Sequence, residues 1–78
     1  MNVTAIILAK NEEETIKKAV QSVSFCDEVL VIDDDSSDST RIKAKEAGAV
    51  VLSRPLDNNF AAQRNWAIKQ ARNEWILL

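Results

Sequence analysis

The sequence predicts an α/β fold in which an open parallel sheet of about four strands is flanked by helices. The first observation is that short apolar runs alternate with segments of helical periodicity. The second is their order, strand, helix, strand, helix, strand, helix, strand, because crossovers between parallel strands need helix-sized connections. The third is composition: of 78 residues, 46% are hydrophobic and 28% are charged, which is typical of a folded domain.

The chain opens with a strand and a helix. Residues 3–9 are apolar apart from Thr4 and too few for a helix, which is typical of a strand covered on both faces. A helix is expected over residues 12–23, with Asn11 as its N-cap and Glu14 as the capping-box partner. Its apolar face is predicted to consist of Ile16, Ala19, Val20 and Val23.

The second strand, residues 29–32, ends in a polar segment over residues 33–38 that is rich in turn-forming and helix-capping residues. Asp38 or Ser37 is expected to cap the helix that follows. The apolar residues of that helix are Ile42, Ala44 and Ala47. Gly48 is the only glycine, and it falls where a helix closes with a residue of left-handed conformation.

The last three elements are a strand, a helix and a strand. Residues 50–52 form the third strand, which Arg54 and Pro55 end. One face of the third helix is marked by Phe60, Ala67 and Ala71. Residues 74–78 resume a strand that no turn or cap follows, so we expect residues 1–78 to be a single partial domain, the front part of a longer protein.

The composition excludes several classes of function. Ten Lys and Arg against twelve Asp and Glu give a net charge of −2, and no segment concentrates the basic residues, so nucleic acid is not an expected partner. Cys26 is the only cysteine and the chain has no His, which excludes an intramolecular disulfide, a zinc site and Ser-His catalysis within this chain. No apolar run approaches the roughly 20 residues that cross a bilayer, so no transmembrane segment is expected.

Two polar loops fall where ligands bind in such sheets, beyond the carboxyl ends of the strands. One begins at residues 9–12 and the other covers residues 33–38, so both are expected to face one crevice. The chain lacks the glycine-rich phosphate-binding motifs, because it has a single glycine. If a nucleotide binds here, its base and ribose must be recognised by carboxylates and backbone groups. An ionised carboxylate is an acceptor only, so it can accept from the imide N–H of a uracil or from a ribose hydroxyl.

Four segments carry motifs that occur together in one family of enzymes. They read I-I-L-A-K-N-E-E at residues 6–13, V-I-D-D-D-S-S-D-S-T at 31–40, A-Q-R-N-W-A at 62–67 and N-E-W-I-L-L at 73–78. In that order they resemble the strand and N-E-E opening, the V-D-D-x-S-x-D-x-T block, the A-x-[RK]-N-x-A helix and the G-[DE]-[WY]-[IV]-L strand of family 2 glycosyltransferases. The resemblance covers the whole chain and implies the Rossmann-like N-terminal half of a nucleotide-sugar-binding GT-A fold. The K-N-E-E opening and the Arg54-Pro55 turn are closest in character to lipopolysaccharide-core and other cell-envelope glucosyltransferases.

The chain departs from the family pattern at two positions. Asp35 and Asn73 stand where the family often has Gly. Both concern turn geometry, and Asp and Asn tolerate left-handed conformations better than other residues that carry a side chain.

The resemblance implies roles for individual residues. Asp34 would accept a hydrogen bond from the uracil, Glu12 and the backbone around Ala9 would approach the nucleoside, Asp33 would support the loop and Arg64 would contact the diphosphate. The expected substrate-binding residues are Ala9, Asn11, Glu12, Asp33, Asp34 and Arg64. No catalytic residue and no metal ligand is expected within this chain.

Simpler structural roles compete with these assignments. The carboxylates of residues 33–35 suit a solvated turn that caps a helix, and Glu12 suits the first turn of a helix because of the helix dipole. Arg64 fits an exposed helix face equally well, since arginine is rarely buried.

The resemblance also implies what a longer parent protein does. Its Asp-x-Asp metal ligands, acceptor site and general base would lie after Leu78. There a divalent cation, Mg²⁺ or Mn²⁺, would bridge the diphosphate of a UDP-sugar while a carboxylate deprotonates the acceptor, in an inverting transfer of a hexose to a cell-envelope glycan or lipid. This chain alone would recognise the donor nucleotide, need no cofactor and be inactive. The parent is expected in the cytoplasm or at the inner face of the membrane.

Two other classes of protein are alternatives. A flavodoxin-like, receiver-type signalling domain also places acids at strand ends, but it needs an acid pair after the first strand, where this chain has Lys10 and Asn11. A non-catalytic oligomerising fragment is the other alternative. Open sheet edges pair with other chains, so a homo-oligomer is expected through the sheet edge or the last strand.

Overall fold

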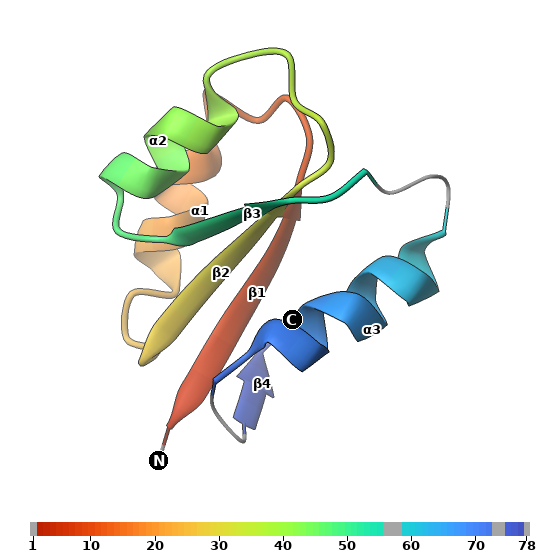
Figure 1. Ribbon diagram of the computed structural model, residues 1–78. Helices are drawn as coiled ribbons and strands as arrows, with labels where there is room; N and C mark the ends of the chain where they lie inside the picture. The colour runs from red at the N-terminus through yellow and green to blue at the C-terminus, as the bar shows by residue number, and fades with distance from the viewer. Residues whose placement is uncertain (1, 56–58, 73–74, 78) are drawn as a thin grey trace.

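The chain has the α/β fold that its sequence predicts, as the computed structural model shows for residues 2–55, 59–72 and 75–77 (Figure 1). The strands are β1 (Val3–Ala9), β2 (Glu28–Asp33), β3 (Val50–Ser53) and β4 (Trp75–Leu77). The helices are α1 (Ile16–Ser22), α2 (Thr40–Glu46) and α3 (Phe60–Gln70). The predicted turn at Asn73 lies outside the described residues.

The four strands form one sheet in the order β3-β2-β1-β4, and every neighbouring pair is parallel. The chain runs outward from β1 to β2 and β3, and then returns to place β4 on the other side of β1. The strand order therefore reverses between β1 and β4. In open parallel sheets this reversal leaves a crevice beyond the carboxyl ends of the strands, which is where ligands bind.

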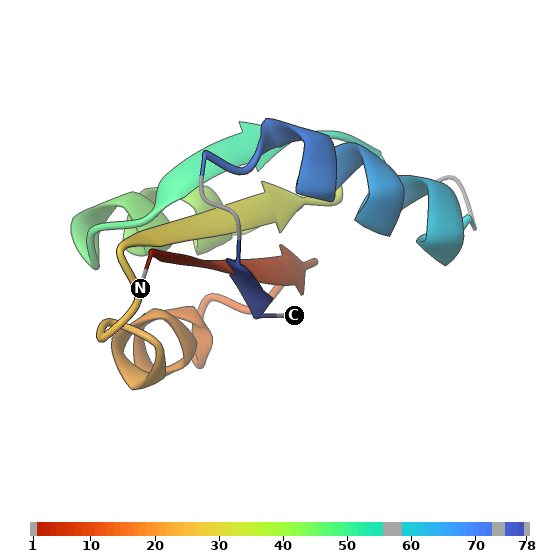
Figure 2. The same cartoon turned by 90° about the horizontal axis from the view of Figure 1, so that it is seen from below.

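Helices cover both faces of the sheet (Figure 2). On one face, Ile16 and Val20 of α1 and Ala44 of α2 pack with Val31 of β2. On the other face, Ala67 of α3 packs with residues of β1 and β2, namely Ile6, Leu30 and Ile32. This two-sided burial explains the continuous apolar runs in the sequence, because each Leu or Ile removed from water stabilises the fold by roughly 1.5–3 kcal/mol.

Helix α1 begins later than the predicted residue 12, and Asn11 is not its N-cap. The N-cap is Thr15, and the N–H groups of Thr15 and Ile16 donate to the Glu12 carbonyl oxygen at 3.0 and 2.8 Å in a preceding turn. Asn11 has a φ of 51°, outside the extended range that an N-cap residue adopts. Its side chain bonds to another loop instead, so a tertiary contact replaces the local cap.

Helix α2 closes as the sequence predicts. Gly48 has a φ of 102° and stands directly after the C-cap residue Ala47. The Gly48 N–H donates to the Lys45 carbonyl oxygen at 3.0 Å, and the Ala49 N–H donates to the Ala44 carbonyl oxygen at 3.1 Å. These two bonds are those of a Schellman motif. At the other end the N-cap is Ser39 and not Asp38 or Ser37.

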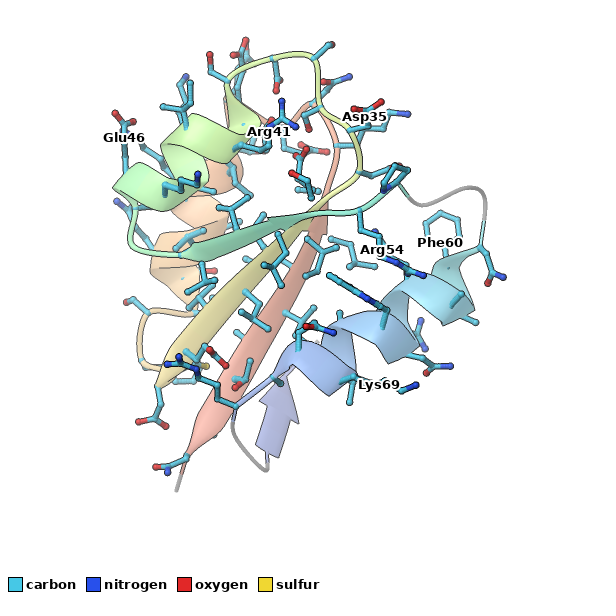
Figure 3. The ribbon with its side chains drawn as sticks, viewed as in Figure 1. Asp35, Arg41, Glu46, Arg54, Phe60 and Lys69 are labelled. Atoms are coloured by element: carbon cyan, nitrogen blue, oxygen red, sulfur yellow. The ribbon has the colours of Figure 1, made fainter. Side chains whose placement is uncertain are left out.

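The buried face of helix α3 differs from the prediction at one aromatic residue, Phe60. Ala67 is fully buried, but Phe60 is 63% exposed. The first turn of α3 is held by Asn59, whose side-chain Oδ1 accepts from the Ala62 N–H at 3.0 Å. Phe60 lies in that first turn, beyond the strands that α3 covers, so its ring does not reach the core (Figure 3).

Arg54 connects the end of β3 to α3. Its Nη1 donates to Gln63 Oε1 at 2.8 Å, and Gln63 Nε2 donates back to the Arg54 carbonyl oxygen at 2.6 Å. The guanidinium lies 5.1 Å from the centroid of the Trp66 ring, within cation–π range. We refer to Arg54, Gln63 and Trp66 as the Arg54 clasp. It fixes the first half of α3 against the carboxyl end of the sheet.

Candidate functional site

The two polar loops singled out in the sequence lie side by side at the carboxyl edge of the sheet (Figure 1). Strands β1 and β2 end in register, with Ala9 opposite Asp33. One residue further on, the Asp34 N–H donates to the Ala9 carbonyl oxygen at 2.8 Å. Residues that are distant in sequence therefore begin their loops from neighbouring points.

Asp33 holds the second loop together from inside. Its side chain is fully buried; its Oδ2 accepts from the Ser36 N–H at 2.9 Å and its Oδ1 from the Ser36 hydroxyl at 2.6 Å. The Arg41 guanidinium lies 3.6 Å from Asp33 Oδ2. A buried carboxylate is stable only with such partners. These contacts tie the Asp33 side chain to the loop that follows β2.

Further hydrogen bonds join the loop after β1 to the loop after β2. The Asn11 N–H donates to Ser36 Oγ, and the Ser37 N–H donates to Asn11 Oδ1, both at 2.9 Å. The Glu12 N–H donates to Thr40 Oγ1 at 2.8 Å. These contacts make the two loops one rigid unit, with Asn11 as a structural link between them.

Two residues in these loops have left-handed backbone conformations. Asn11 has a φ of 51° and Asp35 a φ of 52°. Asp and Asn are the non-glycine residues that adopt this region most readily. Asp35 therefore adopts the left-handed conformation that glycine reaches most easily.

Asp38 is the one titratable group among the described residues with a clear shift in pKa. Thr40 donates to Asp38 Oδ1 through its hydroxyl and, at 2.9 Å, through its N–H, and the Glu13 N–H donates to Oδ2 at 3.3 Å. Chiefly through the Thr40 hydroxyl bond, these contacts lower the pKa of Asp38 below its ordinary value of 3.8, and partial burial only partly opposes them. Asp38 is therefore charged at neutral pH and organises the start of α2.

A hollow of about 230 Å³ opens between these loops and the first turn of α3. It is lined by Leu8, Ala9, Lys10, Glu12, Ile32, Asp34, Phe60 and Gln63. Glu12 and Asp34 thus lie at the same rim, as the sequence predicts. The lining combines apolar residues with two carboxylates, an arrangement typical of small-molecule sites.

The remaining predicted site residues lie elsewhere. Asn11 lines a neighbouring hollow of about 240 Å³ whose other lining residues are Glu12, Glu13, Glu14, Thr15 and Asp38. Arg64 is exposed on α3 and is not among the residues that line either hollow. The structure therefore brings together Ala9, Glu12 and Asp34 but leaves Arg64 apart from them.

Sequence reasoning missed Lys10, Phe60 and Gln63 as lining residues. Lys10 follows β1 directly, so its position after the strand was a usable signal. Phe60 and Gln63 are close together on α3, but no local pattern indicates that α3 docks with these residues at the carboxyl edge.

A larger hollow, of about 580 Å³, lies at the opposite edge of the sheet. Asn2, Cys26, Glu28 and Arg72 are among its lining residues. We place the candidate site at the smaller carboxyl-edge hollow, because parallel α/β sheets bind ligands at that edge and the acidic loops converge there.

The described parts of the chain offer no metal centre. Within residues 2–55, 59–72 and 75–77, no group of three or more His, Cys, Asp or Glu side chains is arranged to hold a metal ion. The donor set needed for a divalent cation is thus not assembled by these residues. In the same ranges, no helix combines the length and apolar character needed to cross a membrane.

Comparisons with known proteins give a consistent result. The family model described as glycosyl transferase family 2 matches residues 4–78. A glycosyltransferase from Rickettsia bellii is 38% identical over 76 residues, which is 96% of this chain and 26% of that protein. Glucosyl-3-phosphoglycerate synthase from Mycolicibacterium smegmatis is 40% identical over 57 residues, or 67% of this chain and 19% of that protein.

A solved structure shares the fold. Glucosyl-3-phosphoglycerate synthase from Mycobacterium tuberculosis, crystallised with Mn²⁺, uridine diphosphate and glucosyl-3-phosphoglycerate, matches with a TM-score of 0.62 and 37% identity. The match covers 67% of this chain and 20% of that one. This chain thus spans about a quarter or less of the length of the relatives it matches.

Proposed function

Because this chain belongs to glycosyl transferase family 2, we propose that it binds the nucleoside part of a UDP-sugar and forms the donor-recognition part of a longer glycosyltransferase. The observation that carries this proposal is that Glu12 and Asp34 line one hollow beyond the carboxyl ends of parallel strands, together with apolar residues. The family match over residues 4–78 also favours this function over a receiver-type signalling domain.

Asp34 is the proposed acceptor for the uracil imide N–H. It lies at the rim of the hollow, and its backbone is fixed to Ala9. A carboxylate there favours a base that presents a donor over one that presents a lone pair. The solved relative that contains uridine diphosphate supports uracil as the base.

The neighbouring residues are assigned to the ribose and the diphosphate. Glu12 would accept from a ribose hydroxyl, and the backbone at Ala9 would approach the nucleoside. Asp33 and Asn11 would act indirectly by holding the loops. Arg64 is assigned to the diphosphate. It does not line the hollow, so we propose that the diphosphate extends out of the hollow to reach it.

The chemistry of transfer is assigned to the parent enzyme and not to this chain. The residues described here do not converge on a metal ion, whereas the solved relative was crystallised with Mn²⁺. We propose that the parent uses Mg²⁺ or Mn²⁺, transfers a hexose with inversion to a cell-envelope glycan or lipid, and works in the cytoplasm or at the inner membrane face. On its own this chain would bind the donor and not turn it over.

Titration with UDP tests the proposal. The chain should bind UDP, and Asp34→Ala should weaken binding by about tenfold to a hundredfold, because a hydrogen bond to a charged group contributes about 1.5–3 kcal/mol. Asp35→Asn removes a carboxylate from the same loop while keeping a residue that tolerates the positive φ there, and gives the matched control for charge. Binding of UDP that is equal in the Asp34→Ala and unsubstituted chains would refute the assigned role.

A further inference from the structure

The unexplained feature of the site is an exposed aromatic ring. Phe60 is 63% exposed, yet it lines the same hollow as Glu12 and Asp34. Exposing a phenylalanine ring is unfavourable in water, and here no core packing accounts for it. We propose that Phe60 is a stacking platform for the nucleobase of the bound nucleotide, an inference that rests on the proposed function.

The size of the hollow fits a base and not a whole nucleotide sugar. Its volume of about 230 Å³ is below the roughly 300–1,000 Å³ of complete ligand sites. Its apolar wall is made by Leu8, Ala9, Ile32 and Phe60. A planar ring placed there would cover apolar surface, while its polar edge points to the carboxylates.

The charged residues that line the hollow determine the orientation of the bound base. Asp34 and Glu12 carry acceptors, and Lys10 provides the cation among the lining residues. A base with an imide N–H satisfies Asp34, and its ribose hydroxyls can reach Glu12. With the edge of the base fixed in this way, the face of the ring is left for an aromatic partner, and Phe60 is the only aromatic residue among the described residues that line the hollow.

The Arg54 clasp keeps Phe60 in place. Gln63 lines the hollow, is buried, and exchanges two hydrogen bonds with Arg54 at 2.8 and 2.6 Å. Gln63 stands one helical turn after Phe60 on α3. Figure 3 shows Arg54 alongside the first turns of the helix that carries Phe60. The platform is therefore mounted on a rigid helix end and not on a mobile loop.

The chain offers a matched control. Phe25 is 76% exposed and lies outside the residues that line the hollow. Phe60→Ala and Phe25→Ala remove the same exposed ring from different places, and neither removes a residue of the buried core. Phe60→Tyr keeps an aromatic face at the site.

The test compares UDP, uridine and pyrophosphate as ligands of these variants. Stacking lost on alanine substitution should raise the Kd for UDP by about tenfold or more in Phe60→Ala. Phe60→Tyr and Phe25→Ala should bind UDP as the unsubstituted chain does, and none of the three should change pyrophosphate binding. In NMR spectra, the uracil ring protons of uridine should shift upfield in the unsubstituted chain and lose that shift in Phe60→Ala.

The outcomes separate this inference from the proposed function. If UDP binding is lost in Asp34→Ala but unchanged in Phe60→Ala, the proposed nucleotide site is supported and the stacking role of Phe60 is refuted. If Phe60→Ala weakens UDP and pyrophosphate equally, the ring acts on the phosphates or on the fold, and the inference is overturned. If the unsubstituted chain binds neither UDP nor uridine, both the proposed function and the inference fail.

Discussion

Adjacent aspartates at the end of β2 have different environments and hence different tasks. Asp33 is fully buried, and its oxygens are taken up by Ser36 and Arg41. Asp34, the next residue, lines the hollow. Asp33 ends β2 and Asp34 follows it, so one carboxylate holds the loop while its neighbour lines the hollow. Both residues are aspartates, so residue type alone does not distinguish the two tasks.

Asp38 leads to a prediction about pH. Its pKa is lowered from 3.8, chiefly by the Thr40 hydroxyl, so its charged form is favoured in the folded chain. A lowered pKa contributes stability that is present above the unfolded value and is lost as pH falls through the folded value. We expect Asp38→Asn to lower the urea midpoint of unfolding at neutral pH, and the difference from the unsubstituted chain to shrink below pH 3.8.

The control for this prediction is Asp35→Asn. Asp35 is exposed in the same loop, and asparagine preserves its tolerance of a positive φ, so this variant removes the same charge without the Thr40 contact. A pH-independent difference between Asp38→Asn and the unsubstituted chain, or the same pH dependence in both variants, would contradict the assignment.

At the scale of elements, specific polar contacts fix where each helix begins or ends, and so determine the positions of the loops. α1 starts at Ile16 because the preceding residues are bound to the loop after β2. α2 ends at the Schellman motif around Gly48, which turns the chain directly into β3. α3 starts at the Asn59 cap and is held by the Arg54 clasp. Each helix therefore takes its position from a specific polar contact as well as from its apolar face.

Gly48→Ala should destabilise the chain by about 1–2 kcal/mol, because a side chain makes the left-handed backbone costly. The φ of Gly48 is 102°, and a Cβ atom built there meets nothing within 4 Å, so the cost is that of the backbone and not of a clash. Chemical denaturation measures the change. Gly48→Asn should cost less than Gly48→Ala, since asparagine adopts positive φ more readily. Equal stability of all three chains would disprove the conformational explanation.

At the scale of the whole molecule, the sheet has two outer strands, β3 and β4. In the described part of the chain, β3 pairs on one side only, with β2. Val50 on β3 is 49% exposed. An open edge with an exposed apolar side chain favours pairing with another chain. We therefore propose that this chain self-associates through its sheet edge.

Sedimentation velocity tests this proposal. At micromolar concentrations the chain should sediment as a species heavier than its 8.7 kDa monomer. Val50→Lys should shift it toward the monomer, because a charge on an edge strand opposes pairing. Ile42→Lys, on the 63% exposed Ile42 of α2, is the control and should leave association unchanged. A monomer at every concentration, or equal effects of the two substitutions, would count against edge pairing.

Much of the candidate site could be predicted because its signals are local. Ala9 ends β1, and Glu12 and Asp34 follow strands that the apolar runs identify; parallel strands deliver their following loops to one edge. The helical role of Asn11 was wrong because its partners, Ser36 and Ser37, are distant in sequence. The role of Phe60 was missed for a similar reason: periodicity assigned it to the core, but the helix extends past the sheet.

The sequence by itself determined the order of strands and helices, the parallel sheet, the left-handed closure at Gly48 and the two acidic loops, because periodicity, turn chemistry and crossover handedness act over short stretches. Only the tertiary structure decided that Asn11 links the two loops and caps no helix, and that Phe60 and Gln63 of α3 line the hollow. These roles depend on hydrogen bonds between segments far apart in the chain and on where α3 docks across the sheet, and neither leaves a pattern in neighbouring residues.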